Sequence, residues 1–340
     1  MLVNFAIIGC GRISGNHLDA IKNAPHARLA AVCDIIEEKA RAAALANGLT
    51  KWYTSAEEML KNEKIDVCCI LTPSGTHCEN ACLAARYGVN VLCEKPLDVT
   101  KEKMQKMLDC CKENNVKLGA VFQRRTHDGA VKIREIVQSG KIGKITLADA
   151  SLKYYRTQEY YDSDKWRGTW ELDGGGALMN QGIHGVDMLD WIMGGIKSVY
   201  ARCETLLWNI DVEDTAVVNV KFKNGAIGVI QATTAAYPGL DTIFSLHGSG
   251  GSISFGDNGL YIWETADKSI KKPEILDSMG GKNCQYISTN KGHTVQIEDM
   301  AIAVMEDRQP MITGEEAMRS VEIILAIYES AKTGMEIFLD

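Results

Sequence analysis

Hydrophobic residues in the first third of the chain form short runs that alternate with amphipathic stretches. The runs are rich in Val, Ile, Leu and Cys, and the stretches between them have the spacing of surface helices. Apolar strands that alternate with helices are typical of a parallel sheet covered on both faces. The sequence therefore predicts a doubly wound Rossmann domain over residues 1–122. Its strands are expected at residues 3–9, 29–33, 67–71, 89–93 and 117–122.

The pattern changes after residue 122, where strand-like segments follow one another with few helices between them. Turn signals such as Lys223-Asn224-Gly225 separate some of these segments, which indicates hairpins and a mostly antiparallel sheet. Residues 123–340 are therefore predicted to form an α/β domain with a large, open-faced sheet for substrate binding and oligomerisation. Its helices are expected at 127–139, 177–193, 295–306 and 315–332, and its strands at 145–155, 199–207, 216–223, 226–234, 241–248 and 260–263.

Length and net charge indicate how many domains to expect and which kinds of partner to exclude. The chain has 340 residues, which suggests two domains, and a formal net charge of −7 that is spread along the sequence. Without a basic cluster or an acidic tail, nucleic acids and anionic membranes are not expected as partners. No apolar run is long enough to span a bilayer, and the first nine residues have the pattern of a strand instead of a signal peptide.

The 11 cysteines indicate a reducing environment. Most lie inside apolar segments, as Cys33, Cys68 and Cys93 do, and neither Cys-x-x-Cys nor a zinc-like Cys/His spacing occurs. An odd number of cysteines in such segments favours reduced thiols that pack as small hydrophobes. We therefore expect a cytoplasmic protein without a bound metal.

A glycine turn, Gly9-Cys10-Gly11-Arg12-Ile13-Ser14, follows the first strand and opens the first helix. The first glycine permits a tight turn, the second lets the backbone approach a pyrophosphate, and Ser14 is small enough for helix–strand packing. The N–H groups at the start of the helix then face the phosphates. This strand–turn–helix context predicts a dinucleotide site.

Asp34 ends the second strand and bears on the choice of cofactor. A carboxylate there accepts hydrogen bonds from both ribose hydroxyls and repels a 2′-phosphate. Ile35 and Ile36 follow, with no arginine nearby to neutralise such a phosphate. The sequence therefore favours NAD over NADP. Asp34 is also suited to capping the helix after it, and the two roles are compatible.

Lys95 lies in Glu94-Lys95-Pro96, at the carboxyl end of the fourth strand. Ligands of open α/β sheets bind beyond the carboxyl ends of the strands, so a lysine here can reach both cofactor and substrate. A second set of polar groups lies in the second domain, where Asn180, His184 and Asp187 have the spacing of one helix face. Three glycines precede this stripe and are expected to allow close approach of a ligand.

These motifs together resemble the Gfo/Idh/MocA family of oxidoreductases. The similarity rests on Gly9–Ser14, on Thr72-Pro73 with His77, on Glu94-Lys95-Pro96 and on the glycine run that leads to His184. This resemblance implies a Rossmann domain, a second α/β domain with an open sheet, and NAD(P)-dependent chemistry on a secondary alcohol of a sugar, sugar nucleotide or cyclitol. An open-faced sheet leaves apolar surface that must be covered, so we also expect a homodimer or homotetramer built through the second domain.

The resemblance implies roles for individual residues. Lys95 and His184 would be the catalytic pair, with Asn180 beside them. The positions expected to line the cofactor are Gly9, Gly11, Arg12, Ile13, Asp34, Thr72, Pro73, Ser74, His77, Glu94, Lys95, Gln123, Trp166 and Arg167. The expected substrate contacts are Lys95, Tyr154, Arg156, Arg167, Asn180 and His184. The two arginines can bind a carboxylate or phosphate through paired hydrogen bonds, and surface salt bridges are an equally good account of them.

One departure from the family pattern is Asn180, where many members carry an aspartate. An amide cannot take up a proton, so Asn180 can only orient a hydroxyl and His184 becomes the better candidate base. The passage from Trp166 to His184 is most similar to the branch of UDP-N-acetylglucosaminuronate 3-dehydrogenases. Lys95 is then expected to stabilise the oxyanion while His184 takes the hydroxyl proton.

Three alternatives remain at this stage. The substrate could be a free pyranoside, a glycoside or an inositol. The chain could also be a non-catalytic, NAD-responsive regulatory protein, although it keeps both Lys95 and His184. Tyr161 and Lys165 have the Tyr-x-x-x-Lys spacing of short-chain dehydrogenases, but they lie outside the nucleotide fold and in a stretch without helical amphipathicity.

Overall fold

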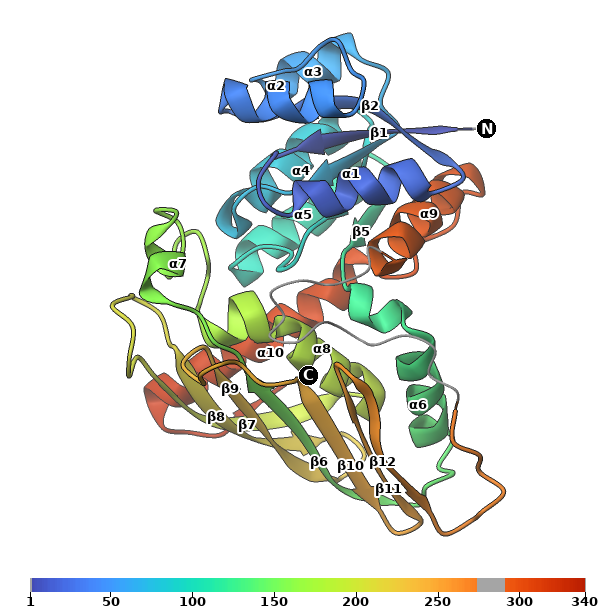
Figure 1. Ribbon diagram of the computed structural model, residues 1–340, viewed down its shortest axis with the longest axis vertical. Coiled ribbons are helices and arrows are strands. Elements are labelled where there is room, and N and C mark those ends of the chain that lie inside the picture. The colour runs from blue at the N-terminus through green and yellow to red at the C-terminus, as the bar shows by residue number, and fades with distance from the viewer. Residues whose placement is uncertain (1, 274–290, 340) are drawn as a thin grey trace. The chain divides into compact units, whose positions relative to one another are not determined.

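The structure is a computed structural model that describes residues 2–273 and 291–339 (Figure 1). These residues form two compact units. Unit 1 contains the described residues up to Gln123 together with 291–318, and unit 2 contains residues 124–273 together with 319–339.

Unit 1 contains a five-stranded parallel sheet with the order β2-β1-β3-β4-β5. Most residues of these strands are buried and apolar, as the sequence predicts for a sheet covered on both faces. The strands are β1 (Val3–Ile8), β2 (Ala27–Cys33), β3 (Val67–Ile70), β4 (Asn90–Cys93) and β5 (Leu118–Ala120). The helices between them are α1 (Ser14–Asn23), α2 (Glu37–Ala46), α3 (Ala56–Asn62), α4 (His77–Arg86) and α5 (Lys101–Glu113), with short 3₁₀ turns at Ser74–Thr76 and Gln123–Thr126.

Helix α9 (Lys291–Met305) completes the core of unit 1. It packs against α1, and its apolar residues Ile297, Met300 and Ala301 belong to the same buried cluster as Phe5 of β1. The sequence-based division at residue 122 assigned this helix to the second domain. Hydrophobic periodicity defines a helix and its apolar face, but it carries no information about which distant sheet that face will cover.

Unit 2 contains an eight-stranded sheet with the order β12-β11-β10-β6-β9-β8-β7-β13. The pair β6–β9 is parallel and the other pairs are antiparallel, which confirms the predicted mixed α/β architecture. The strands are β6 (Ile145–Lys153), β7 (Ile196–Glu204), β8 (Thr215–Phe222), β9 (Ile227–Thr233), β10 (Ile243–Gly248), β11 (Gly251–Gly256), β12 (Gly259–Thr265) and β13 (Ile337–Phe338). The sequence analysis did not predict β11 and β13.

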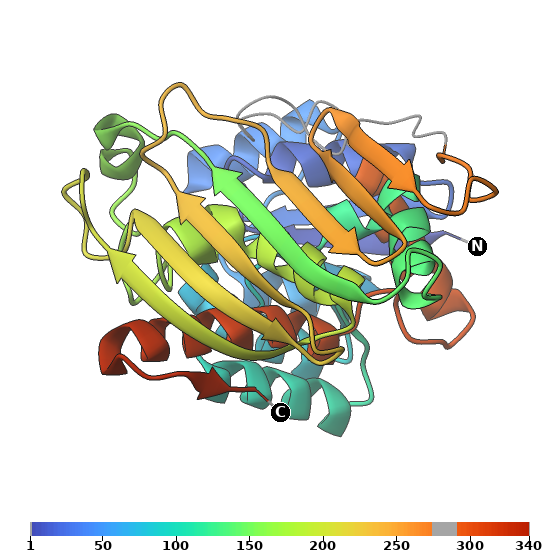
Figure 2. The same cartoon turned by 90° about the horizontal axis from the view of Figure 1, so that it is seen from below.

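The helices of unit 2 lie on one side of this sheet. They are α6 (Asp128–Gln138), α7 (Gln158–Asp162), a π turn η3 (Ala177–Gly182), α8 (Ile183–Met193) and α10 (Gly314–Thr333), whose first turn counts with unit 1. In Figure 2 the opposite face of the sheet is turned to the viewer, and no described helix covers it. Residues on β8 alternate strictly between buried and exposed, as expected for a sheet with one solvated face.

The described cysteines and helices add two facts. The ten described cysteines are all free thiols, and most of them are buried. Burial raises the pKa of the Cys33 thiol to about 12, and the pKa of the Cys68 thiol also lies above its ordinary value. Among residues 2–273 and 291–339, no helix is long and apolar enough to cross a membrane.

Candidate cofactor and substrate sites

The glycine turn after β1 has the geometry that a dinucleotide requires. Gly9 has a φ of +103°, and a Cβ atom there would lie 2.7 Å from the backbone of Leu71, so a side chain is excluded on both grounds. Gly11 differs, because a Cβ atom there would meet no heavy atom within 4 Å and the residue is exposed. The protein itself leaves the space beside Gly11 open, which suits the close approach of a pyrophosphate.

Helix α1 begins directly behind this turn with an uncapped N-terminus. Ile13 is its N-cap and provides no side-chain acceptor, and the first turn has no acidic residue. The Ser14 hydroxyl donates to the carbonyl of Gly11 over 2.7 Å, while Arg12 is exposed beside it. The N-terminal end of a helix attracts phosphate, so these residues fit the predicted cofactor.

Asp34 connects the glycine turn to the loop after β2. One carboxylate oxygen accepts the N–H of Cys10 over 2.7 Å, and the other accepts the N–H of Ile36 over 2.8 Å. An ionised carboxylate has about four acceptor sites, so two remain for ribose hydroxyls. The bond to Ile36 closes a turn ahead of α2, whose N-cap is Ile36 and has no side-chain cap, so the alternative of Asp34 as a helix cap is wrong.

His77 joins the turns that follow β3 and β4. One ring nitrogen lies 2.8 Å from the carbonyl of Thr72, and the other lies 2.8 Å from the carbonyl of Pro96. The side chain is almost fully buried, as is Ser74, whereas Thr72 and Pro73 are half-buried. The imidazole therefore fixes the spacing of the two turns, and its contribution to a cofactor site is indirect.

Glu94 points into unit 1 and not toward its surface. Its carboxylate lies 2.8 Å from Nε2 of His17 on α1, accepts the Lys95 N–H over 3.1 Å and lies 3.7 Å from Nε2 of His293 on α9. Burial opposes its ionisation, but the bond from His17 and the nearby ring of His293 hold the pKa of Glu94 well below its ordinary value. The carboxylate thus binds the Lys95 backbone from within unit 1, which is a different contact from the one with cofactor that the sequence predicted.

The sequence analysis missed His17 and His293. His17 lies on the buried face of α1, and burial keeps its pKa below the ordinary value, so the neutral ring donates to the Glu94 carboxylate. With Glu94 the two histidines have the donor types of a zinc site. The 2.8 Å contact between His17 and Glu94 is a hydrogen-bond length and accounts for the pair without a metal.

Lys95 and Gln123 follow β4 and β5 at the carboxyl edge of the parallel sheet. Lys95 is half-buried, and Gln123 is buried. Because the strand ends at Gly9, Thr72 and Lys95 belong to neighbouring parallel strands, the structure gathers these turns along one edge. Unit 1 therefore brings together the predicted nucleotide residues, with the Glu94 and His77 side chains as their support.

In unit 2, the predicted polar stripe begins in a π turn. Residues 177–182 wind as a π helix, and α8 starts at Ile183, so Asn180 and His184 are not related by regular α-helical spacing. Both residues are half-buried. Asp187 is buried and binds Arg125 through two bonds of 2.8 and 2.5 Å, which removes it from the stripe.

Asn180 is held from one side by Asp173, which comes just before the glycine run. The Asn180 amide donates to Asp173 over 2.5 Å, and the other Asp173 oxygen accepts the N–H of Gly168 over 2.9 Å. This leaves the amide oriented by a carboxylate that the sequence analysis did not single out. The signal for Asp173 was its position beside the glycine run.

Arg167 is the centre of a cation–π cluster in the loop beside this turn. Its guanidinium lies 4.4 Å from the Tyr160 ring centroid and 4.5 Å from that of Trp166, and it binds Asp164 over 3.0 Å. Tyr160 also accepts a bond from Gln181 over 3.1 Å, which ties the cluster to the π turn. Unit 2 therefore brings predicted contacts at Trp166 and Arg167 into one network with Asn180.

Two predicted substrate contacts differ in their exposure. The Arg156 side chain is half-buried, with its guanidinium 5.3 Å from the Tyr160 ring centroid, beside the cation–π cluster. Tyr154 is fully buried, and its hydroxyl lies 3.3 Å from that of Thr242. Tyr154 is part of the core of unit 2, and the prediction that it contacts substrate finds no support in this packing.

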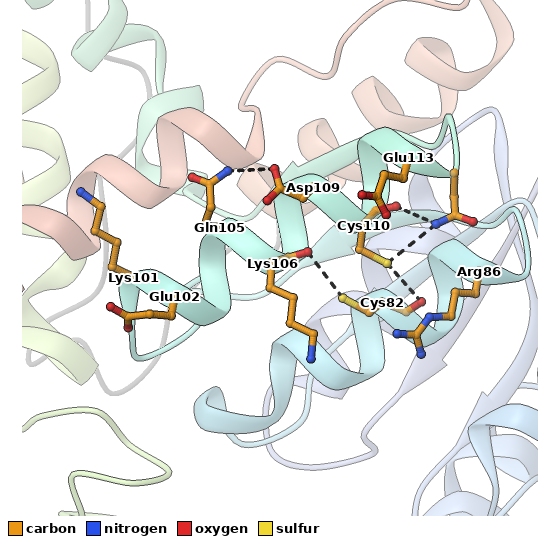
Figure 3. A pocket seen from close by; sticks show the side chains of 10 residues that line it. Cys82, Arg86, Lys101, Glu102, Gln105, Lys106, Asp109, Cys110 and Glu113 are labelled. Atoms are coloured by element: carbon orange, nitrogen blue, oxygen red, sulfur yellow. Dashed lines mark hydrogen bonds between the residues drawn. The ribbon is translucent and has the colours of Figure 1, made fainter.

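A hollow on unit 1 lies between α4 and α5 (Figure 3). Its lining carries charges of both signs, and it contains none of the predicted site residues. We assign it to neither cofactor nor substrate. The residues that line it are Cys82, Arg86, Lys101, Glu102, Gln105, Lys106, Asp109, Cys110, Glu113 and Asn114.

Comparison with known families agrees with this geometry. Residues 3–122 match the oxidoreductase family with an NAD-binding Rossmann fold, and residues 130–254 match the GFO/IDH/MocA C-terminal domain. The protein belongs to the Gfo/Idh/MocA family of oxidoreductases. Unit 1 is thus its NAD-binding domain, which confirms the expected cofactor, and the chain is an NAD-dependent dehydrogenase.

Several known enzymes are similar to this chain over almost its whole length. The WlbA dehydrogenase of Bordetella pertussis, solved with NADH and UDP-GlcNAcA, is 33% identical with a TM-score of 0.89, over 100% of this chain and 99% of that one. Myo-inositol 2-dehydrogenase of Thermotoga maritima is 27% identical over 98% of this chain and 96% of its own. Scyllo-inositol 2-dehydrogenase (NAD(+)) of Bacillus subtilis is 24% identical over 99% and 96%.

Proposed function

We propose that the protein transfers hydride between NAD and a secondary hydroxyl of a sugar nucleotide, with UDP-N-acetylglucosaminuronate oxidised at its 3-position as the specific candidate. The observation that carries the proposal is the similarity to the Bordetella pertussis enzyme over the full chain, since that protein was solved with UDP-GlcNAcA. The cation–π cluster at Arg167 supports an anionic substrate, because a guanidinium binds carboxylate or phosphate through paired hydrogen bonds.

Lys95 and His184 are proposed to act on the same hydroxyl group, as the family resemblance implies. His184 takes the hydroxyl proton, and the Lys95 ammonium stabilises negative charge on the oxygen. Asn180, held by Asp173, orients the hydroxyl and takes up no proton. NAD, when bound at the glycine turn, supplies the acceptor for the hydride. Gly11 and the N-terminus of α1 would hold its pyrophosphate and Asp34 its ribose.

The test is a spectrophotometric assay for reduced nicotinamide with three substrates. UDP-N-acetylglucosaminuronate is expected to support turnover with NAD, and UDP-N-acetylglucosamine, which lacks the carboxylate, is expected to support much less. Turnover with myo-inositol alone would replace the sugar-nucleotide proposal by the second candidate, an inositol or free-pyranoside dehydrogenase, which the two inositol dehydrogenases favour.

We also propose that unit 2 forms a homodimer or homotetramer through its uncovered sheet face. Large apolar side chains are exposed on strands of this sheet, and contiguous exposed apolar surface marks interaction sites. They include Leu147, Tyr200, Val217 and Ile227. Light scattering is expected to give a multiple of the monomer mass, and a double variant, V217K with I227K, is expected to lower it. A monomeric wild-type protein would contradict this proposal.

The free thiols support a cytoplasmic location as the accompanying proposal. Most of the ten described cysteines are buried and none is in a disulfide, which suits a reducing compartment. Fractionation of the source cells with an antibody against the protein tests the location directly. Recovery outside the cytoplasmic fraction would contradict it.

A further inference from the structure

Glu213 accepts hydrogen bonds from three consecutive backbone N–H groups at the start of the π turn. Its carboxylate accepts the Gly176 N–H over 2.9 Å and the Leu178 N–H over 2.8 Å, and its own carbonyl accepts the Ala177 N–H over 3.0 Å. The first N–H groups of a helix lack partners within the helix, so one residue here satisfies the end of the turn. Glu213 is buried, and it lies just before β8.

The glycine run is shaped to fit Glu213 and Tyr328 of α10. A Cβ atom on Gly176 would lie 1.8 Å from the Glu213 carbonyl oxygen, and one on Gly175 would lie 2.1 Å from the Tyr328 hydroxyl. The Tyr328 hydroxyl in turn donates to the Glu213 carboxylate over 2.9 Å. The close approach that these two glycines permit is therefore to the protein's own groups, and not to a ligand as the sequence suggested.

The π turn links the residues that bind Glu213 directly to the candidate catalytic groups. The Asn180 N–H donates to the Gly176 carbonyl over 3.1 Å, and His184 follows in the first turn of α8. Because Gly176 and Leu178 are both bound by the Glu213 carboxylate, that carboxylate is linked to the backbone from which Asn180 projects. π turns are frequent at functional sites, and this one depends on an acceptor from the segment just before β8.

We infer that Glu213 is a positioning residue, whose ionised carboxylate holds Asn180 and His184 in working geometry and whose protonation releases them. The inference rests on the proposed function of Asn180 and His184. An ionised carboxylate accepts from the Gly176 N–H, the Leu178 N–H and the Tyr328 hydroxyl together. A protonated carboxyl uses one oxygen for its own O–H, so one N–H loses its acceptor. Glu213 touches neither substrate nor cofactor in this scheme and acts through the turn.

The surroundings of Glu213 place this switch near neutral pH. Burial raises the pKa of Glu213 to about 7, against the hydrogen bonds from Leu178, Gly176 and Tyr328 that favour the charged form. Two other titratable groups face it. Burial raises the pKa of Tyr328 well above its ordinary value, and burial raises the pKa of the Cys203 thiol on β7 to about 12. Both therefore stay neutral where Glu213 titrates.

The experiment compares the full-length wild type with E213Q, Y328F and a control, E204Q, which alters an exposed carboxylate on β7. The first readout is kcat with UDP-N-acetylglucosaminuronate and NAD, across pH values on both sides of the pKa of Glu213. The wild type is expected to gain activity through that pKa. E213Q is expected to lose this ionisation and to fall about tenfold to 100-fold below wild type at high pH.

The second readout does not depend on turnover and is amide hydrogen exchange of residues 176–184. In the wild type, protection beyond the intrinsic pH effect is expected to increase as Glu213 ionises, and in E213Q it is expected to stay constant. Y328F removes a hydrogen bond to the ionised Glu213 carboxylate, so the midpoint of the pH dependence of protection is expected to move to higher pH. This variant still tests the inference if E213Q does not fold.

The outcomes separate this inference from the proposed function. E204Q is expected to match wild type in both readouts. If the wild type turns over none of the substrates, the proposed function fails while the exchange data still decide the inference. The inference is overturned if E213Q retains the wild-type pH profile, or if wild type and E213Q show the same pH dependence of exchange.

Discussion

The Nε2 atom of His17 lies 2.8 Å from the Glu94 carboxylate, and both side chains are buried. This contact joins the helix behind the glycine turn to the strand end that bears Lys95. Since the same carboxylate accepts the Lys95 N–H, the position of the lysine depends on a histidine far from it in sequence.

Replacing His17 tests this dependence. H17A leaves a buried carboxylate without its imidazole partner, which is expected to cost about 3 kcal/mol of unfolding free energy. H17Q keeps a donor of similar reach and is expected to lose less. Urea unfolding followed by circular dichroism measures both. Equal stability of H17A and wild type would show that the pair contributes nothing.

Asp34 is expected to control the choice between NAD and NADP. D34N keeps the acceptor for one backbone N–H and removes the charge that repels a 2′-phosphate. The ratio of NADPH to NADH affinity is expected to rise at least about tenfold, or 1.4 kcal/mol. Fluorescence titration with both nucleotides measures it without any substrate, and an unchanged ratio counts against the assignment.

Lys95 and His184 are expected to matter for turnover and not for cofactor binding. K95M and H184N, made separately, are expected to lower kcat by about 10²-fold to 10⁴-fold, because each removes a group proposed to act on the hydroxyl. NADH titration of the same variants is expected to match wild type. Near-normal turnover in both variants would contradict the assignment of Lys95 and His184 as catalytic residues.

Asp187 is expected to be structural, despite its spacing from His184. D187N weakens a buried pair with Arg125 and a bond from Ser320, so a loss of about 3 kcal/mol in unfolding free energy is expected. NADH affinity of the folded variant is expected to be unchanged. Full stability of D187N in urea would argue that the ion pair is dispensable.

Glu213 makes stability depend on pH with a sign opposite to most carboxylates. Its folded-state pKa of about 7 lies above the unfolded value, so the protonated form favours the folded state and stability falls as pH rises toward 7. Relative to E213Q, the wild type is expected to lose about 3 kcal/mol across that window. Chemical denaturation at a series of pH values measures the difference, and parallel curves would contradict it.

The sequence predicted most of the strands and helices, but fewer of the side-chain contacts that hold them in place. Apolar runs and the glycine turn located the parallel strands, because burial on both faces leaves a direct mark on composition. The π turn could not be predicted, since Asn180 and His184 have the same spacing in sequence whether the backbone winds as α or π. The direction of Glu94 was also hidden, because a residue just past a strand can face either the surface or the core.

Contacts between distant segments account for the other differences. His17, His293 and Glu213 carry no local motif, and each acquires its role from a partner on another element. The same holds for Asp187, whose partner Arg125 lies 62 residues earlier in the sequence. Such pairings depend on tertiary packing, which hydrophobic periodicity does not encode.

The place of α9 in the core of unit 1 has a consequence for biosynthesis. Residues 291–318 are translated after residues 124–273 of unit 2 and before its last segment, 319–339. They supply Ile297, Met300 and Ala301 to the buried cluster that also contains residues of β1. The nucleotide domain therefore lacks part of its core until residues 291–318 have been translated, which happens after residues 124–273 of unit 2. Domains usually fold in order from the N-terminus during synthesis. In this chain strands β6 to β12 of the unit 2 sheet are made before the helix that completes unit 1.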